Sequence, residues 1–349
     1  MVKRFFVLLM LLLSALAVTG CGGGGGNDSG NPAPIITDPI TITPLSLVEL
    51  DPILTGDAQD VIAAGNKLYY IGRNDSGNSF GIIDFTDPTN PEILSTLDVG
   101  EAWGLAFDGR YAFVETDGRG DGILATGTVG VIDCLDPLLP VVKIADASGH
   151  SLAYDMEISG DYLYNFSDNI IGVYNISAPE NIVHVQNVNV VSAEFGKIVG
   201  NYLYTGDNFS SDLVIHDISA PTGQIPEVGR LHIDSAGHAA TASGTTAFIA
   251  GIDGAEDVIY SVDVSDPTNP AIIKSVVTPS YIGNEMRILG HYLLAVGNDD
   301  FVVIDIADPE NMTVVGSVTL GNSLGWGFDV SGRYAIIADD TVLRIIQLY

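Results

Sequence analysis

Short apolar runs alternate with turn residues from about residue 45 to the end of the chain, and the arrangement returns about every 42 residues. Each unit ends in an apolar run followed by an acid or amide, small residues and proline, in the copies GIIDFTDP, VGVIDCLDP, IGVYNISAP, LVIHDISAP, YSVDVSDP and FVVIDIADP. The anchor residues of these phrases are Asp84, Asp133, Asn175, Asp217, Asp263 and Asp305, with a degenerate seventh copy at Gln347. A repeat of this length made of short strands is typical of a β-propeller, in which each unit is one blade.

A second landmark in every unit is a glycine followed by an aromatic or apolar pair. Glycine next to polar residues between alternating apolar runs predicts a two-stranded hairpin, because glycine adopts the positive φ that these turns need. The seven glycines are Gly65, Gly109, Gly160, Gly200, Gly244, Gly290 and Gly332. We interpret the tyrosines that follow several of them as packing between blades, and the recurrent acids at the anchors as turn formers rather than catalytic carboxylates.

The order of strands within a unit predicts an all-β fold, a seven-bladed β-propeller of four-stranded antiparallel blades spanning residues 42–349. Six units have an outer strand after the proline, whereas the last unit stops at Tyr349, directly after its third strand. The segment LSLVEL, residues 45–50, is available upstream of the first hairpin. Because an open ring would expose unpaired strand edges, we expect this N-terminal strand to close the last blade.

Counting back from each hairpin glycine reveals two further registers. Seven residues back, every unit has Ala or Gly, which predicts inner strands that converge on a narrow channel; the residues are Ala58, Ala102, Ala153, Ala193, Gly237, Gly283 and Gly325. Six residues back, every unit has an aromatic, polar or ionisable residue; the residues are Gln59, Trp103, Tyr154, Glu194, His238, Asn284 and Trp326. The second register predicts a polar and aromatic ring at the mouth of the channel.

This ring lies on the predicted binding face. In a propeller the start of the inner strand shares a face with the connections between the second and third strands, which are long here in the segments GRNDSGNS, ETDGRGDGILATGT, GDNFSSD and GIDGAED. Loops on a rigid scaffold around such a funnel are where binding is expected. We therefore predict that the seven ring residues bind a ligand, for which a sugar or a peptide suits the aromatic, amide and acid side chains. The alternative is that the aromatic members wedge between blades and the polar members meet channel water.

The sequence offers no recognisable catalytic set. The six histidines include no pair at metal-ligand spacing, and no nucleophile elbow, phosphate loop or dinucleotide fingerprint stands in a suitable context. Propeller enzymes assemble sites from single residues of several blades, so a hydrolase or lyase acting on a carbohydrate or small ester is the alternative function. Glu194, His238 and His150 are the first candidates for such a site.

One loop of the second unit is a candidate calcium site. Asp117 and Asp121, with Glu115 just before them, lie on a glycine-rich turn whose acids and carbonyls are of the kind that bind Ca²⁺. The loop lacks the regular alternation of an EF-hand. No other cofactor is expected.

The phrases GIIDFTDP, LVIHDISAP and FVVIDIADP resemble the LVIVD repeat, which is found in bacterial envelope and extracellular proteins. The resemblance covers residues 45–349 and implies a seven-bladed propeller displayed outside the cytoplasm. The repeat motif is structural and carries no catalytic residues that transfer to this chain. Asn175 and Gln347 depart from the acid of the pattern.

The N-terminus predicts export and a lipid anchor. Residues 1–20 combine Lys3 and Arg4 with a short apolar run, which is typical of a secretory signal and too short for a spanning helix. The ending VTGC resembles a bacterial lipobox, whose cysteine, here Cys21, receives a diacylglyceryl group; the alternative is an ordinary signal peptide with an incidental cysteine. Residues 21–41 form a flexible glycine-rich tether. We expect an extracytoplasmic, lipid-anchored protein on an outer membrane or cell surface.

Charge narrows the class of partner. The chain has 13 basic and 44 acidic residues, a net charge of −31, and loses two of the basic residues with the signal peptide. Such a field repels phosphate backbones, so nucleic acid and anionic lipid surfaces are excluded as partners. We expect a monomeric propeller that acts as a binding or scaffolding module, touching the membrane only through its anchor, with a protein, peptide or carbohydrate partner.

Overall fold

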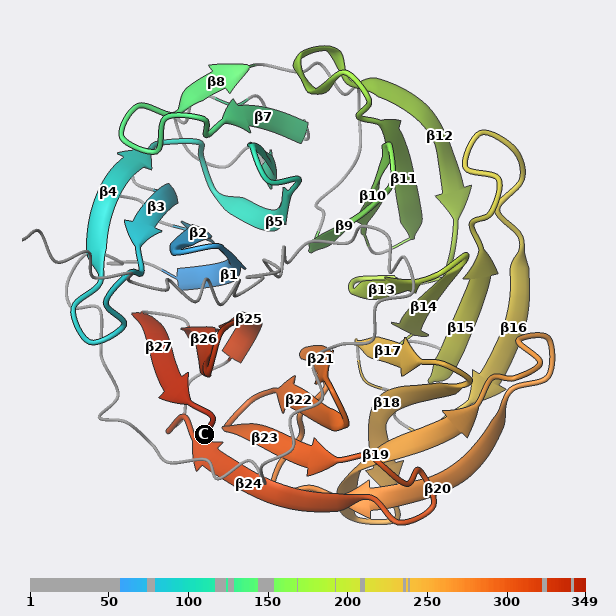
Figure 1. Cartoon of the computed structure of the whole chain (residues 1–349). Coiled ribbons are helices and arrows are strands. Elements are labelled where there is room, and N and C mark those ends of the chain that lie inside the picture. The colour runs from blue at the N-terminus through green and yellow to red at the C-terminus, as the bar shows by residue number, and fades with distance from the viewer. Residues whose placement is uncertain are drawn as a thin grey trace, which may run out of the picture.

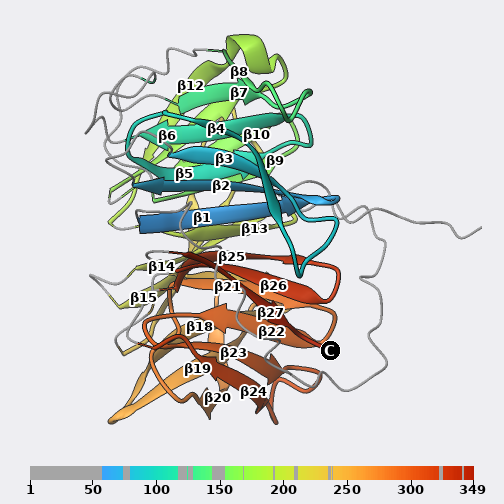
Figure 2. The ribbon, with the colours of Figure 1, turned by 90° about the vertical axis from the view of Figure 1, so that its left-hand side faces the viewer.

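The computed structural model describes residues 57–349 apart from 74–78, 117–123, 125–128, 144–153, 168, 192, 208–210, 235–236, 238, 322–324 and 340–341. Seven antiparallel sheets stand in a circle around a central axis (Figure 1). Figure 2 shows the ring edge-on, with strands running between its two faces. The predicted seven-bladed propeller is confirmed.

Each blade follows the chain from the axis outward. The first three blades are β1 (Asp57–Ala64), β2 (Lys67–Arg73), β3 (Phe80–Asp84) and β4 (Glu92–Leu97); β5 (Ala102–Phe107), β6 (Tyr111–Thr116), β7 (Val129–Asp133) and β8 (Val141–Lys143); and β9 (Asp155–Ser159), β10 (Tyr162–Phe166), β11 (Ile170–Asn175) and β12 (Val183–Asn189), with a short 3-10 helix at Pro179–Asn181. The next three are β13 (Gly196–Val199), β14 (Tyr202–Asp207), β15 (Asp212–Asp217) and β16 (Glu227–His232); β17 (Ala240–Ser243), β18 (Thr246–Asp253), β19 (Glu256–Asp263) and β20 (Ala271–Val277); and β21 (Glu285–Leu289), β22 (Tyr292–Val296), β23 (Asp300–Asp305) and β24 (Thr313–Thr319).

The seventh blade shows three strands in the described part of the chain, β25 (Gly325–Ser331), β26 (Tyr334–Asp339) and β27 (Val342–Gln347). The predicted closing strand at residues 45–50 lies outside the described residues, and so does the tether. No helix among the described residues is long and apolar enough to cross a membrane.

Both sequence landmarks do what the pattern predicts. All seven hairpin glycines have positive φ, from 58° at Gly160 to 103° at Gly109, which L side chains rarely adopt. The six acid or amide anchors end the third strands, and each accepts a hydrogen bond from the backbone N–H two residues later, as in Asp217 Oδ1 with Ser219 N at 2.9 Å. The anchors are therefore turn residues, because the side chain replaces a missing backbone partner at the corner.

The core is divided into seven clusters of buried apolar side chains, one between each pair of neighbouring blades. Between the first and second blades, Tyr69 stacks on Phe107 with ring centroids 4.1 Å apart. The tyrosines after the hairpin glycines belong to these clusters, as Tyr111 and Tyr292 illustrate. The blades are thus joined by packing, and this packing fixes the positions of the inner strands at the axis.

Candidate funnel and channel site

A cavity of about 410 Å³ opens where the inner strands begin. Its lining is mostly aromatic and amide side chains: Gln59, Trp103, Tyr154, Glu194, Phe195, Tyr281, Asn284, Asn298 and Trp326. Six of the seven ring residues predicted from the sequence therefore meet at one cavity, which we call the funnel. The seventh, His238, lies outside the described residues. That these residues bind a ligand stays a prediction.

Bulges in three inner strands aim ring residues into the funnel. The register of β1 with β2 jumps between Ala58 and Asp60, which leaves Gln59 as the extra residue. The register of β5 jumps in the same way around Trp103, and that of β25 jumps between Gly325 and Phe328, around Trp326. A bulge leaves a residue unpaired and redirects its side chain. Simple alternation along these strands would not place these side chains together.

The Ala and Gly register behaves differently from the expectation. Ala58, Ala102 and Ala193 are fully buried within the clusters between blades rather than facing an open channel. A Cβ at Gly325 would lie 2.3 Å from Val296 Cγ2, and one at Gly237 would lie 2.8 Å from Ala250 Cβ, both on second strands. Small residues are needed here because adjacent strands approach closely, so the expected channel-facing position was wrong. Ala153 lies outside the described residues.

Hydrogen bonds hold one side of the funnel in place. Asn284 is 5% exposed, and its Nδ2 donates to Gly325 O at 2.9 Å, linking the sixth blade to the residue before Trp326. Asn298 N donates to Tyr281 O at 3.1 Å, so two lining residues from separate connections are joined. Trp103 and Tyr154 meet edge to face, with centroids 5.7 Å apart and planes at 80°. This side of the cavity is preorganised by contacts between blades.

The loops around the funnel differ from the expectation in the fifth blade. Instead of a long loop, β18 and β19 extend to Asp253 and Glu256, which pair across a two-residue turn. Gly254 in that turn has a φ of 66°, which permits the tight reversal. The alternating run GIDGAED therefore continues the hairpin.

Several predicted site residues cannot be placed in this geometry. The calcium candidates Asp117 and Asp121, the catalytic candidate His150 and the lipidation candidate Cys21 all lie outside the described residues. Glu115 is described: it lies in β6, is 1% exposed and accepts a hydrogen bond from Asn165 Nδ2. It therefore belongs to a contact between the second and third blades. Among the described residues, no group of three or more His, Cys, Asp or Glu is placed to hold a metal ion.

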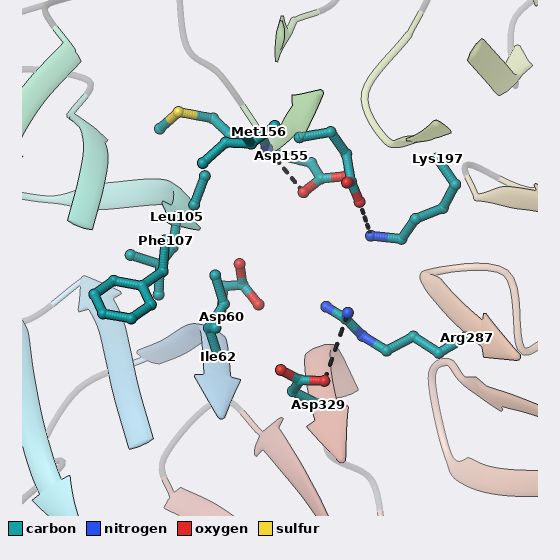
Figure 3. Close-up of a pocket in the computed structure, with 12 residues that line it drawn as sticks. Asp60, Ile62, Leu105, Phe107, Asp155, Met156, Lys197, Arg287 and Asp329 are labelled. Atoms are coloured by element: carbon teal, nitrogen blue, oxygen red, sulfur yellow. Dashed lines mark hydrogen bonds and ion pairs between the residues drawn. The ribbon is translucent and has the colours of Figure 1, made fainter. Parts of the chain in front are cut away.

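A second group of ionisable side chains, which we call the channel network, lies deeper on the axis. It contains five acids and two cations from the inner strands of five blades: Asp60, Asp155, Glu157, Lys197, Glu285, Arg287 and Asp329. Figure 3 shows five of them pointing from different strands toward one central space. A small cavity of about 30 Å³ lies among them.

The two cations bridge blades. Lys197 Nζ lies 2.5 Å from Glu157 Oε1 and 3.4 Å from Glu285 Oε1. Arg287 Nη2 lies 2.9 Å from Glu285 Oε1, and Arg287 Nη1 lies 3.5 Å from Asp329 Oδ1 (Figure 3). The carboxylates also accept backbone N–H groups, as Asp329 Oδ2 does from Ala63 N at 2.9 Å. Ion pairs thus tie the third, fourth, sixth and seventh blades together at the axis, and the Asp329 carboxylate reaches the first.

Burial and an excess of acids raise the pKa values of two carboxyl groups in the network. Burial raises the pKa of Asp155 to about 7, while Lys197 opposes the shift and Glu157 adds to it. Burial, with Glu285 and Asp155 nearby, also raises the pKa of Asp60 well above its usual value. Both shifts reflect carboxyl groups that lack enough positive charge and water around them.

Sequence reasoning missed the network, although its signal was present. Asp60, Asp155 and Glu285 stand five residues before a hairpin glycine; Glu157, Lys197, Arg287 and Asp329 stand three residues before one. Continuing the count along the inner strands would have found them. The funnel residues Phe195, Tyr281 and Asn298 belong to neither predicted register. Phe195 and Tyr281 lie in connections between blades, and Asn298 lies in the connection between β22 and β23.

Comparison with known proteins supports the repeat and the fold. The family model described as LVIVD repeat matches residues 55–99, 197–228, 242–278 and 284–320, which confirms the resemblance in four segments. No curated protein matches the chain. Among solved structures, the chain is similar to the WD40 β-propeller domain of Doa1 (TM-score 0.61, 12% identity, covering 84% of this chain and 94% of that one). It is also similar to the computationally designed Ika8 protein (TM-score 0.58, 12% identity, covering 93% of this chain and 100% of that one). A functionally unknown protein from Desulfotomaculum acetoxidans is similar as well (TM-score 0.57, 14% identity, covering 76% of this chain and 86% of that one). At such low identities, the similarity shows a shared fold and nothing about function.

Proposed function

We propose that this propeller with LVIVD repeats is a binding module of the cell envelope, which takes its ligand in the funnel and is anchored by a lipid on Cys21. The observation that carries the proposal is the convergence of six ring residues, brought from six blades, on one cavity of about 410 Å³. That volume falls within the range of small-molecule and side-chain sites. A lining of aromatic and amide groups held by contacts between blades suits recognition.

Binding is favoured over catalysis by the makeup of the lining. Glu194 is its single ionisable carboxylate among the described residues, and no nucleophile, base and orienting group stand together in it. A hydrolase or lyase needs acids, a base or a metal converging on one reacting atom. The enzyme alternative would therefore depend on His238 joining Glu194 across the funnel.

The anchor is supported by the sequence. The apolar leader, the small residues before Cys21 and the glycine-rich stretch after it are the pattern of a lipidated export signal. Stable attachment would require more than one acyl chain. Cys21→Ser should move the protein from the membrane fraction to the soluble fraction and abolish incorporation of a fatty-acid label. Unchanged membrane association without label would contradict the anchor.

The binding role is tested with tryptophan fluorescence. The chain has two tryptophans, Trp103 and Trp326, and both line the funnel, so their emission reports this cavity selectively. A panel of sugars, peptides and small amines is screened for a change in emission and for a raised thermal midpoint. A ligand at about 100 times its Kd stabilises by about 2.7 kcal/mol, enough to raise the midpoint by several degrees.

Variants separate the funnel from the rest of the surface. Asn298→Ala, at an exposed lining position, should weaken ligand binding without lowering the midpoint of the free protein. The matched control is Asn90→Ala in the turn before β4, which should bind normally. Ligands that stabilise the protein equally in both variants and leave tryptophan emission unchanged would place the site elsewhere and refute the proposal.

A further inference from the structure

We infer that the ligand of the funnel carries a positive charge, an ammonium group seated against the aromatic side chains above the acidic channel network. The inference rests on the proposed binding role and names the class of ligand. It follows from the lining of the funnel, the floor beneath it and an unsatisfied amide at the boundary between the two.

The charge and the aromatic rings of the lining favour a cation over an anion. Five of its nine residues are aromatic: Trp103, Tyr154, Phe195, Tyr281 and Trp326. The face of an aromatic ring is negative, and tryptophan is the strongest of these partners for a cation. The one charged lining residue is Glu194, and the lining contains no Lys, Arg or His among the described residues. An anionic ligand would meet the Glu194 carboxylate with no cationic side chain of the described lining to offset it.

The floor of the funnel adds negative charge. Three lining residues are followed directly in sequence by an acid of the channel network: Gln59 by Asp60, Tyr154 by Asp155 and Asn284 by Glu285. Consecutive residues lie about 3.8 Å apart along the backbone, so these carboxyl groups belong to the layer just below the lining. In the channel network as a whole, five acids face two cations. A pocket with low-dielectric walls focuses such an excess on whatever enters it.

The raised pKa values agree with this arrangement. Burial raises the pKa of Asp60 most, and repulsion from Glu285 and Asp155 raises it further. A positive group above the network would relieve that repulsion.

Gln59 supplies the independent observation of an unfilled site. Its side chain is 4% exposed, lines the funnel and has a buried Nε2 that meets no hydrogen-bond partner in the described part of the chain. An unsatisfied buried amide is costly and calls for a partner. Because Nε2 is a donor, the ligand should carry an acceptor such as a hydroxyl or carbonyl beside its ammonium group.

The test compares cations with neutral partners of the same shape, using the full-length protein in detergent. Choline is paired with its carbon analogue, in which a tert-butyl group replaces the trimethylammonium group. N-acetyl-lysine amide is paired with N-acetyl-norleucine amide. The first pair represents a free small molecule and the second a peptide side chain, and each probe carries a hydroxyl or carbonyl acceptor. Titrations are followed by tryptophan emission and by calorimetry.

At least one cation should bind at least about tenfold more tightly than its neutral partner, the size expected for a desolvated contact between a cation and aromatic rings. Asp60→Asn should lower the affinity for that cation severalfold and leave the neutral partner unchanged. Asp155→Asn gives a second reading if the first variant folds poorly. The matched control is Glu310→Gln, an exposed acid in the turn between β23 and β24, which should change neither affinity.

The outcomes separate the two proposals. Equal binding of cations and neutral partners, or binding of neutral sugars while both cations fail, overturns the cationic ligand and leaves the binding role intact. If Glu310→Gln reduces the preference for the cation as much as Asp60→Asn does, the preference comes from the overall charge of the protein, and the inference is also overturned. If no compound of either panel alters tryptophan emission or the thermal midpoint, both proposals fail.

Discussion

Replacing Arg287 with methionine tests whether the channel network holds the ring together. The guanidinium lies 2.9 Å from Glu285 and 3.5 Å from Asp329, and its Nε donates to Phe328 O at 2.7 Å. Methionine keeps much of the side-chain volume and removes the charge. Glu285 and Asp329 then stay in the channel with 8% and 7% of their side chains exposed and without this partner.

The magnitude follows from that burial. Breaking a buried ion pair by removing one partner costs about 3–5 kcal/mol, because the remaining charge is left uncompensated. The Arg287 side chain is 25% exposed, so solvent screens part of the effect. We expect a loss of about 3 kcal/mol, which lowers the thermal midpoint of a chain of this size by about 5–10 °C. Urea unfolding followed by far-UV circular dichroism gives the free energy independently.

The control is an arginine with better pair geometry at the surface. Arg110 makes two hydrogen bonds to Asp133, at 2.9 and 2.6 Å, with 45% of its side chain exposed. Exposed pairs contribute little because water solvates both charges, so Arg110→Met should hardly change the midpoint. A double-mutant cycle of Arg287→Met with Asp329→Asn should show a coupling of about 1 kcal/mol. If the two arginine variants are equally mild, the network does not clamp the blades and our reading of it is wrong.

Two further perturbations test the site from other directions. Burial raises the pKa of Asp155 from 3.8 to about 7, so the folded protein keeps a proton that the unfolded chain loses; the stability from this group is full below about pH 4 and is lost as the pH rises toward 7. Between about pH 5 and 7 the free energy of unfolding of the native protein should fall with pH more steeply than that of Asp155→Asn, by roughly 1 kcal/mol per pH unit. Urea unfolding at several pH values measures both slopes, and equal slopes would contradict the raised pKa. Gly325→Ala should lose about 1–3 kcal/mol in thermal unfolding, because its Cβ would lie 2.3 Å from Val296 Cγ2, whereas Gly223→Ala, with its nearest contact at 3.3 Å, should be close to neutral. Equal midpoints in the two glycine variants would show that β25 and β22 can move apart to admit the added methyl group.

The fold could be predicted from the sequence because its determinants are local and repeated. A glycine with positive φ and an acid two residues before a backbone N–H each act within a few residues, as at Gly65 and Asp84. Seven copies of such signals fix the number of blades. The contacts between blades were not needed to predict this number.

The site was predicted only in part, since its geometry depends on contacts between blades. Register counting found Trp103 and Trp326, yet the bulges that aim them into the funnel leave no distinct mark in the sequence. The same count misplaced Ala58, whose small size fits a contact with the neighbouring blade instead of an open channel. Tyr281 and Asn298 come from connections. The repeat predicts the face on which the connection with Asn298 lies, but not which of its side chains enters the funnel.

The hydrogen bond between Ala63 and Asp329 joins residues 266 positions apart, across the junction of the first and last blades. The entropic cost of closing a loop grows with its length, so we expect the junction of these two blades to form after the intervening blades have assembled. Trp103 and Trp326 stand on either side of the first blade, in the second and the seventh. We therefore expect the complete funnel to exist only once the first and last blades have met, so a nascent or proteolytically shortened chain would lack the proposed binding site.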